Sequence, residues 1–490
     1  MAFSLNIENF GKLANATINI GNLTILAGPN NTGKSHVSKL LYSLFDAMNA
    51  NHALVHFESL SRPVRRRLWH LETSMRKSGL MRSPRSRADF KSPLSPFAGD
   101  LKMMRDIIIT HVSESTRGED ELLVLDRFHH KLIETADAMR ERYDAFESSI
   151  TDMLNQNDVL SFKGSRIVRD NVFRITRENV LESAEELKSA INEMHEKISN
   201  TSLLNFIFSG IESKIYENLL HNYQIESLEE LKGYRENSPF AKISDIGSFR
   251  FDADSVEFGI DRSGLQQLQE YSKVIYLESP LYWKLGAALE TISPRFRHSD
   301  RISLDGVPGY FFDLAKVLKS KISGKMDFPD LFENLTKVLG GKLILSETGE
   351  LLFSEAERTF SMHLTATGVV NLGILALLIE RKVLDKGTFL FIDEPEAHLH
   401  PAWQVVMAET LFELAQHGVN VVIATHSVDI LKWIDVRTKK TPDDKQLIAL
   451  NHFTPDGVKS NEEDFEFKLA GIKESLTEPF LNLHLKGLGL

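Results

Sequence analysis

A glycine-rich segment at residues 28–35, with the sequence GPNNTGKS, constrains the fold of this chain more than any other feature. It follows an apolar run at residues 23–27 and precedes residues 36–48, where apolar side chains recur at helical spacing. This order of strand, glycine-rich turn and helix predicts an α/β fold in which the loop leads directly into the start of a helix.

The residue types in this loop are those that bind phosphate groups. Glycines let backbone N–H groups approach a phosphate closely, and the N-terminus of the following helix favours negative charge. We expect the Lys34 ammonium to reach the β- and γ-phosphates of a nucleotide, and the Ser35 hydroxyl to ligate Mg²⁺. The predicted phosphate-binding residues are Asn30, Asn31, Thr32, Gly33, Lys34 and Ser35.

Two further apolar strands are followed by polar residues. Residues 388–392 precede Asp393 and Glu394, and residues 421–424 precede Thr425 and His426. Because open α/β sheets bind ligands at the carboxyl ends of their strands, we expect these side chains at the same site. Asp393 is predicted to hold Mg²⁺ through water, and Glu394 to act on the attacking water as a general base. His426 is a candidate contact of the γ-phosphate.

The composition limits the class of protein. A length of 490 residues predicts two or three lobes, and the absence of cysteine excludes disulfides, thiolate metal sites and a cysteine nucleophile. No apolar run reaches the length of a bilayer span, so we expect a cytoplasmic protein that makes no membrane contact. A net charge of −11 disfavours a chain-wide nucleic-acid surface, although residues 62–91 hold ten Lys or Arg and two acidic residues.

The stretch between the glycine-rich loop and the two carboxylates is predicted to be an insertion into the α/β core. Residues from Arg62 to about Gly99, rich in Pro, Ser and Arg, predict an irregular exposed segment. Its basic part, from Arg62 to Lys91, could bind DNA, RNA or an acidic protein. The predicted divisions are residues 1–60 for the first half of the core, 61–245 for the basic loop and helical insertion, 246–460 for the second half, and 461–490 for the tail.

Periodicity predicts the elements around these motifs. Helices are expected at residues 121–156, 177–200, 202–236, 369–380 and 403–415. Strands are expected at residues 249–260, 274–277, 342–345, 351–353, 388–392, 419–424 and 446–450.

With these motifs, the chain resembles the ABC-type ATPases of the SMC and RecF kind, and within them the prokaryotic AAA-family proteins of anti-phage defence. Residues 28–35 match the Walker A loop, and residues 393–401, DEPEAHLHP, are similar to the run that combines Walker B with the D-loop. Residues 425–427, THS, match the switch-histidine motif. The resemblance implies ATP and Mg²⁺ as cofactors, and an ABC-type P-loop NTPase core split in sequence by a helical insertion.

In such proteins two subunits sandwich ATP, so the resemblance also implies a homodimer or a higher homo-oligomer. The signature-like loop falls at residues 364–371, where Thr367 and Gly368 would contact the nucleotide of the opposite subunit. Val369 stands where the family has a small or polar residue, so we expect slow hydrolysis. The nearest counterparts of the family's Q-loop glutamine are Gln266, Gln267 and Gln269.

Among these proteins, the chain resembles the ATPase subunits of PARIS, Septu and OLD/Gabija-like systems, and this resemblance suggests the first hypothesis for function. Nucleotide state would control a scaffold or sensor that holds a separate effector, a nuclease or a toxin. We expect no Toprim nuclease, because the stretch after His426 is short and Asp252 and Asp254 fit an ordinary turn. Two alternatives stay open, a RecF- or SMC-like DNA-repair ATPase and a nucleotide-gated scaffold with little hydrolysis.

Overall fold

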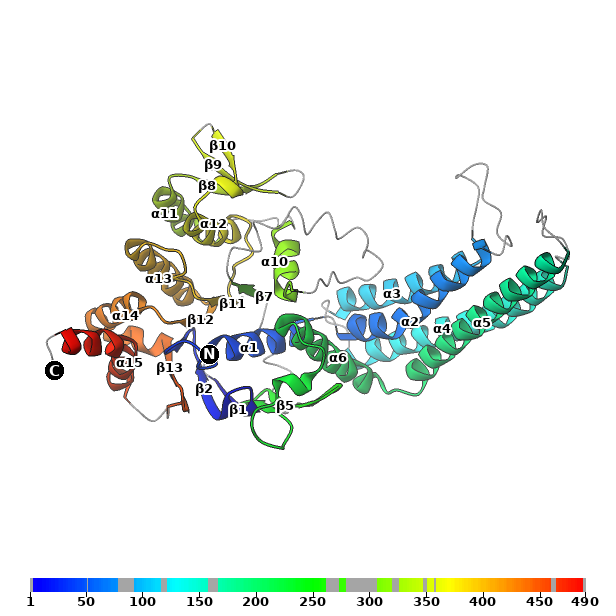
Figure 1. The fold of residues 1–490 in the computed structure, drawn as a ribbon, viewed down its shortest axis with the longest axis horizontal. Helices are drawn as coiled ribbons and strands as arrows, with labels where there is room; N and C mark the ends of the chain where they lie inside the picture. The colour runs from blue at the N-terminus through cyan, green and yellow to red at the C-terminus, as the bar shows by residue number, and fades with distance from the viewer. Residues whose placement is uncertain are drawn as a thin grey trace. The chain divides into compact units, whose positions relative to one another are not determined.

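A computed structural model divides the chain into two compact units (Figure 1). The first joins Met1–Asn49 to Ile215–Leu490, and the second is Ala50–Lys214. Within the described residues, none of the helices combines the length and the apolar character needed to cross a membrane. The described residues are 3–50, 52–77, 92–115, 121–156, 166–260, 273–278, 306–319, 326–346, 350–356, 358–459 and 464–487.

A six-stranded sheet forms the centre of the first unit. Its strands are β3 (Leu23–Ala27), β7 (Val274–Leu277), β11 (Phe389–Asp393), β12 (Asn420–Thr425), β13 (Ile448–Thr454) and β14 (Gly457–Val458). They lie in the order β14-β13-β3-β12-β11-β7, with all neighbours parallel except β14 and β13. The strand that precedes the second unit in sequence, β3, thus lies between two strands that follow it. This arrangement confirms an α/β core that is split in sequence.

Helices pack on both faces of this sheet, because alternate side chains of each strand point to opposite apolar layers. They are α1 (Lys34–Met48), α10 (Gly309–Lys319), α12 (Thr367–Glu380), α13 (Pro401–Gln416), α14 (Val428–Lys440) and α15 (Phe465–Gly487), while α11 (Pro329–Leu339) packs on α12. On one face Phe389 stacks on Phe45 of α1, with ring centroids 4.4 Å apart. On the other, Leu390 and Ile392 share a core cluster with buried residues of α12, α13 and α14.

Two antiparallel sheets complete the first unit. A five-stranded sheet has the order β2-β1-β4-β5-β6, and a three-stranded sheet has the order β10-β9-β8. Ala253 and Asp254 form the two-residue turn between β5 and β6, as the sequence predicts. The strands are β1 (Phe3–Phe10), β2 (Leu13–Ile20), β4 (Phe240–Ile243), β5 (Gly247–Asp252), β6 (Ser255–Ile260), β8 (Lys342–Leu345), β9 (Leu351–Glu355) and β10 (Arg358–Ser361).

The second unit is helical. Its helices are α2 (His52–Lys77), α3 (Ser95–Ser115), α4 (Glu121–Gln156), α5 (Arg166–Ser199) and the first part of α6 (Leu203–Tyr223). α4 and α5 run antiparallel, since Asp137 pairs with His195 at 2.6 Å and Glu147 pairs with Lys188 at 2.6 Å. Tyr143, buried between them, donates its hydroxyl hydrogen to the carbonyl of Ala184.

The prediction of an irregular segment from Arg62 to about Gly99 was wrong for residues 62–77, which belong to α2, and for residues 95–99, which belong to α3. The buried residues of α2 recur at intervals of three and four and join the core of the second unit. Burial of this mainly apolar stripe stabilises the helix by more than Pro63 destabilises it. Pro63 lies inside the helix and removes one backbone hydrogen-bond donor. Residues 78–91 lie outside the described part of the chain. The stripe consists of Phe57, Ser61, Val64, Leu68, Leu71 and Met75.

Leu390→Ala should destabilise the first unit, because Leu390 lies in the middle of β11 with none of its surface exposed. Loss of a buried leucine costs about 2–5 kcal/mol through lost burial and the cavity it leaves. Leu364→Ala is the matched control, because Leu364 is 81% exposed and should change stability by less than about 0.5 kcal/mol. Urea denaturation followed by circular dichroism compares the two. Equal effects would contradict the assignment of Leu390 to the core.

Candidate nucleotide-binding site

The predicted site residues come together at one edge of the parallel sheet. β3, β12 and β11 are neighbours, and their registers pair Ala27 with Thr425 and Asp393 with Ala424. All three strands therefore end at the same level, and each is followed by one of the predicted motifs. This is the edge at which open α/β sheets bind their ligands.

The glycine-rich loop has a backbone that only particular residues can adopt. Gly28 has φ 154° and Gly33 has φ 96°, and Asn31 adopts the left-handed region at φ 65°. A Cβ on Gly28 would lie 2.0 Å from the carbonyl oxygen of Phe453 on β13, so any larger residue would push the loop off the sheet. The loop is therefore held in place by β13 as well as by β3.

The loop also presents free donors. In the described structure, the backbone N–H groups of Asn31, Thr32, Gly33, Lys34 and Ser35 donate no hydrogen bond to other protein groups. They lie at the N-terminus of α1, where the helix dipole favours negative charge. Such a cradle of N–H groups fits phosphate oxygens.

Lys34 is the cation of this cradle. Its side chain is buried, and its ammonium donates hydrogen bonds to the carbonyls of Gly28 at 2.9 Å and Pro29 at 2.6 Å. Burial lowers the pKa of Lys34, and the carboxylates of Asp393, Glu394 and Glu396 act in the opposite direction.

Ser35 and Asp393 form a pair of oxygen ligands. The Ser35 hydroxyl donates to Asp393 Oδ1 at 3.0 Å, which joins the loop to the end of β11. Burial raises the pKa of Asp393 to about 6; the hydrogen bond from Ser35 lowers it, while the nearby Glu278 carboxylate raises it further. Two adjacent oxygens of this kind suit Mg²⁺, whose positive charge would offset the cost of burying the carboxylate.

Glu394 and His426 meet beside this pair. Glu394 adopts a left-handed backbone at φ 52°, and its N–H donates to the carbonyl of Ala424 at 2.9 Å. Its carboxylate lies 3.6 Å from Nδ1 of His426, and about half of the side chain is exposed. A left-handed glutamate is strained, and strain of this kind is concentrated at functional sites.

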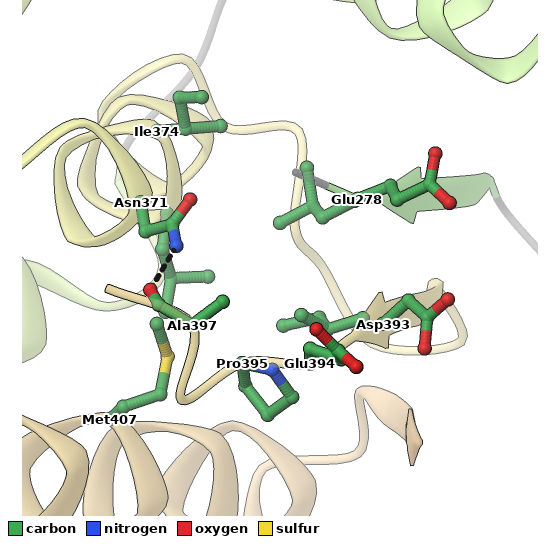
Figure 2. A pocket seen from close by; sticks show the side chains of 11 residues that line it. Glu278, Asn371, Ile374, Asp393, Glu394, Pro395, Ala397 and Met407 are labelled. Atoms are coloured by element: carbon green, nitrogen blue, oxygen red, sulfur yellow. Dashed lines mark hydrogen bonds between the residues drawn. The ribbon is translucent and has the colours of Figure 1, made fainter. Parts of the chain in front are cut away.

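Glu278 is a site residue that the sequence prediction missed. It directly follows β7, and the register pairs Leu277 with Ile392, so Glu278 lies level with Asp393 at the next strand (Figure 2). Its carboxylate pairs with Lys39 at 3.1 Å and accepts a hydrogen bond from the Tyr310 hydroxyl. The signal in the sequence was an apolar run at residues 274–277 ending in a carboxylate, the pattern also found before Asp393. The three glutamines proposed for the Q-loop lie outside the described residues.

A second group of missed residues lies at the rim of the pocket. The cavity beside the glycine-rich loop measures about 420 Å³ and is also lined by Lys12, Lys232 and Tyr234. Tyr234 is 91% exposed, and its loop is fixed by Asn9, whose side-chain oxygen accepts a hydrogen bond from the N–H of Arg235 at 3.0 Å. These residues are distant from residues 28–35 in sequence, so no local pattern marks them.

Thr367 and Gly368 lie at the start of α12 and are not among the described residues that line this pocket. Gly368 packs on the segment after Glu394, because a Cβ there would lie 2.5 Å from the carbonyl oxygen of His398. Asn371 donates to the carbonyl of Ala397 at 2.9 Å in the same place (Figure 2). The glycine thus has a packing role within the chain, and contact with the nucleotide of a second subunit stays a prediction.

Comparison with known proteins identifies a family. A family model described as "AAA domain, putative AbiEii toxin, Type IV TA system" matches residues 23–432. No curated protein sequence matches the chain.

Three solved structures of SMC head domains are similar, each at 12% identity. One from Pyrococcus furiosus, with an extended coiled coil and bound to the C-terminal domain of ScpA, has a TM-score of 0.29, with 96% of this chain and 98% of that chain covered. One from Pyrococcus yayanosii has a TM-score of 0.30, with 97% and 99% covered. One from Thermotoga maritima has a TM-score of 0.25, with 48% and 78% covered.

Asp393→Asn should raise the free energy of unfolding of the nucleotide-free protein in EDTA at pH 8. Because burial raises the pKa of Asp393 from its ordinary 3.8 to about 6, folding penalises the charged carboxylate above that pH. At ~1.4 kcal/mol per pKa unit the gain is about 2–3 kcal/mol at pH 8, and it falls toward zero near pH 4. Urea denaturation at pH 8 and pH 4.5 measures it, with Asp456→Asn as the exposed control. A gain of the same size at both pH values would contradict burial of the charged carboxylate as its cause.

Proposed function

The chain belongs to this AAA-domain family of P-loop ATPases, and from this premise we propose that it binds and hydrolyses ATP to control a separate effector protein. The observation that carries the proposal is the convergence of Lys34, Ser35, Asp393, Glu394 and His426 at one edge of the sheet. Residues from opposite ends of the chain supply the cradle, the metal ligands and the base that phosphate-anhydride hydrolysis needs.

The residues present fit ATP and Mg²⁺. The free N–H groups of the loop and the Lys34 ammonium would hold the phosphates, while Ser35 and Asp393 would hold Mg²⁺ directly or through water. Mg²⁺ would neutralise charge on the phosphate oxygens. Glu394 would orient and deprotonate a water molecule, a role supported by the exposure of its carboxylate next to Asp393 in sequence and by its distance of 3.6 Å from His426 Nδ1.

We further propose that the active form is a homodimer or a higher homo-oligomer. Thr367 lies at the N-terminus of α12, and Leu364 beside it is 81% exposed. A second copy that covers this face would place Thr367 and Gly368 near the nucleotide of its partner. The branched Val369 next to them supports slow turnover.

The effector is proposed to be a nuclease or toxin of an anti-phage system, made as a separate chain. The description of the family names a toxin of a type IV toxin–antitoxin system, which supports a role in such systems. Nucleotide-dependent contacts at residues 393–400 would decide whether the effector is held or released.

Glu394→Gln should abolish ATP turnover while leaving ATP affinity within a few-fold, because the amide is neutral and unable to accept the proton of the attacking water. The protein is purified from its native operon, ATP hydrolysis is measured, and co-purifying chains are identified. We expect a small protein to co-elute stoichiometrically and its retention to change in the variant. Glu409→Gln, an exposed glutamate on α13, is the matched control.

Other outcomes separate the alternatives. A wild-type protein that binds ATP without turnover, yet changes its retention of the small protein with nucleotide, would replace the ATPase by a nucleotide-gated scaffold. A wild-type protein that elutes alone and hydrolyses ATP faster with DNA would remove the effector proposal in favour of a DNA-repair ATPase.

One observation favours that second function. The outward face of α2, opposite its buried stripe, carries Arg62, Arg66, Trp69, Arg76 and Lys77, all exposed. Trp69 is 56% exposed, and Glu72 is paired with Arg76 at 2.7 Å. Cations interleaved with an exposed aromatic ring suit a phosphate backbone and a stacked base, in contrast to the net charge of −11.

If this face binds nucleic acid, Arg66→Glu and Trp69→Ala should each weaken binding of single-stranded DNA several-fold. Arg66→Glu should also reduce the slope of log K against log salt by about 1–2, because fewer counterions are released. Fluorescence anisotropy at several salt concentrations measures both. Arg140→Glu, an exposed arginine on α4, is the control. If the slope of log K against log salt is the same in all variants, this face of α2 does not bind nucleic acid and instead faces solvent or contacts a protein.

A further inference from the structure

Glu396 is a buried carboxylate beside the site that none of the roles above uses. Its side chain is 6% exposed, and its Oε1 accepts hydrogen bonds from the Thr425 hydroxyl and from the backbone N–H of His426, both at 2.8 Å. The same oxygen lies 3.3 Å from Nδ1 of the His426 imidazole. One carboxylate oxygen thus contacts the backbone and the ring of the candidate γ-phosphate residue.

The backbone around Glu396 is built to direct its side chain toward β12. Glu394 at φ 52° and His398 at φ 61° lie on either side of it, both in the left-handed region. Tight turns close the segment, since Ala397 donates to the carbonyl of Glu394 at 2.9 Å and Leu399 donates to that of Glu396 at 3.0 Å. Non-glycine residues keep such angles only where surrounding contacts hold them there.

A ring of hydrogen bonds joins this segment to the histidine loop. Thr425 Oγ1 accepts from the N–H of Ser427 at 3.0 Å, and the Ser427 hydroxyl donates to Gln404 at 2.7 Å. Gln404 in turn donates to the carbonyl of Leu399 at 3.2 Å. The ring closes because the N–H of Leu399 donates to the carbonyl of Glu396. Residues 395–399 and 425–427 are therefore tied at both ends and should move together.

Two polar atoms inside this arrangement have no hydrogen-bond partner among the described residues, Glu396 Oε2 and His426 Nδ1. Burying a carboxylate with one oxygen unpaired costs stability, and a neutral side chain of similar shape would avoid that cost. An acidic side chain in this place, where a neutral one would pack as well, therefore indicates a requirement beyond packing. The Glu396 carboxylate lies 3.3 Å from His426 Nδ1, although the two atoms do not form a well-aligned hydrogen bond.

We propose that Glu396 is a positioning residue for the hydrolysis proposed above, on which this inference rests. Its carboxylate sets the rotamer of His426 and keeps the imidazole proton on Nδ1, as a carboxylate beside a histidine does in other sites. Nε2 is then the ring atom left to act at the nucleotide. Through the hydrogen-bond ring, and through Asn371 on α12, the position of His426 is linked to residues 395–399.

Glu396→Gln tests the proposal with little change in shape. The amide oxygen can still accept from Thr425 and from the N–H of His426, but its charge toward Nδ1 is lost. We expect kcat for ATP to fall at least 10-fold while KM changes little and the melting temperature stays the same or rises, since the amide avoids the cost of burying the carboxylate. The double variant with His426→Gln should be no slower than His426→Gln alone, because both changes remove the same function. Glu409→Gln is the control.

A second readout needs no turnover. In protein labelled with ¹⁵N-histidine, the ring signals of His426, identified by their absence in His426→Gln, should show the proton on Nδ1 in the wild type and a shifted tautomer balance in Glu396→Gln. Unchanged ring signals, or a double variant whose effects simply add, would overturn the proposal. A wild type without ATPase activity would instead refute the proposed function and leave the ring signals as the test of Glu396.

Should Glu396→Gln fail to fold, Thr425→Val and Thr425→Ser give the same information. Valine removes the hydroxyl that donates to Glu396 and accepts from the N–H of Ser427, whereas serine keeps both hydrogen bonds. We expect the valine variant to lower kcat and shift the His426 ring signals, and the serine variant to resemble the wild type. Equal behaviour of the two variants would contradict the positioning role of the carboxylate.

Discussion

The pairing of β3 with β12 and β13 brings the two halves of the core together in one sheet. It places residues 23–27 between strands that lie about four hundred residues later in the chain. Closing so long a loop costs only slightly more entropy than closing a shorter one, because that cost grows with the logarithm of length. The buried apolar strands and the helices on both faces offset it, and the second unit can therefore interrupt the core.

The consequence of this pairing is a concentration of charge and backbone strain at one sheet edge. Burial shifts the pKa of Lys34 downward and that of Asp393 upward, so both charged forms are held at a cost. A bound phosphate and a divalent cation would each relieve one of these penalties, which is the behaviour of a site organised for ligand rather than for stability. Glu394 and His398 adopt left-handed conformations at the same edge, and the packed apolar layers beneath are rigid enough to hold them.

Elements whose signal is local could be predicted from the amino-acid sequence. The strands at β3, β11 and β12, the loop at residues 28–35, and the helix at residues 121–156 follow from periodicity and residue type, because neighbours in sequence set them. The prediction was wrong at residues 62–77, where Pro63 and many arginines suggested an irregular segment. The apolar stripe of this segment stabilises a helix only when it packs against other helices.

The distant residues that join the site could be identified from the three-dimensional fold and not from local sequence patterns. Glu278 reaches it because β7 pairs with β11, Tyr234 because Asn9 fixes its loop, and Glu396 because a left-handed turn directs it toward His426. None of these contacts has a fixed spacing in sequence, since strand pairing and loop clamping join segments regardless of their separation. The sequence therefore specified the chemistry of the phosphate-binding edge, and the fold selected the residues that position it.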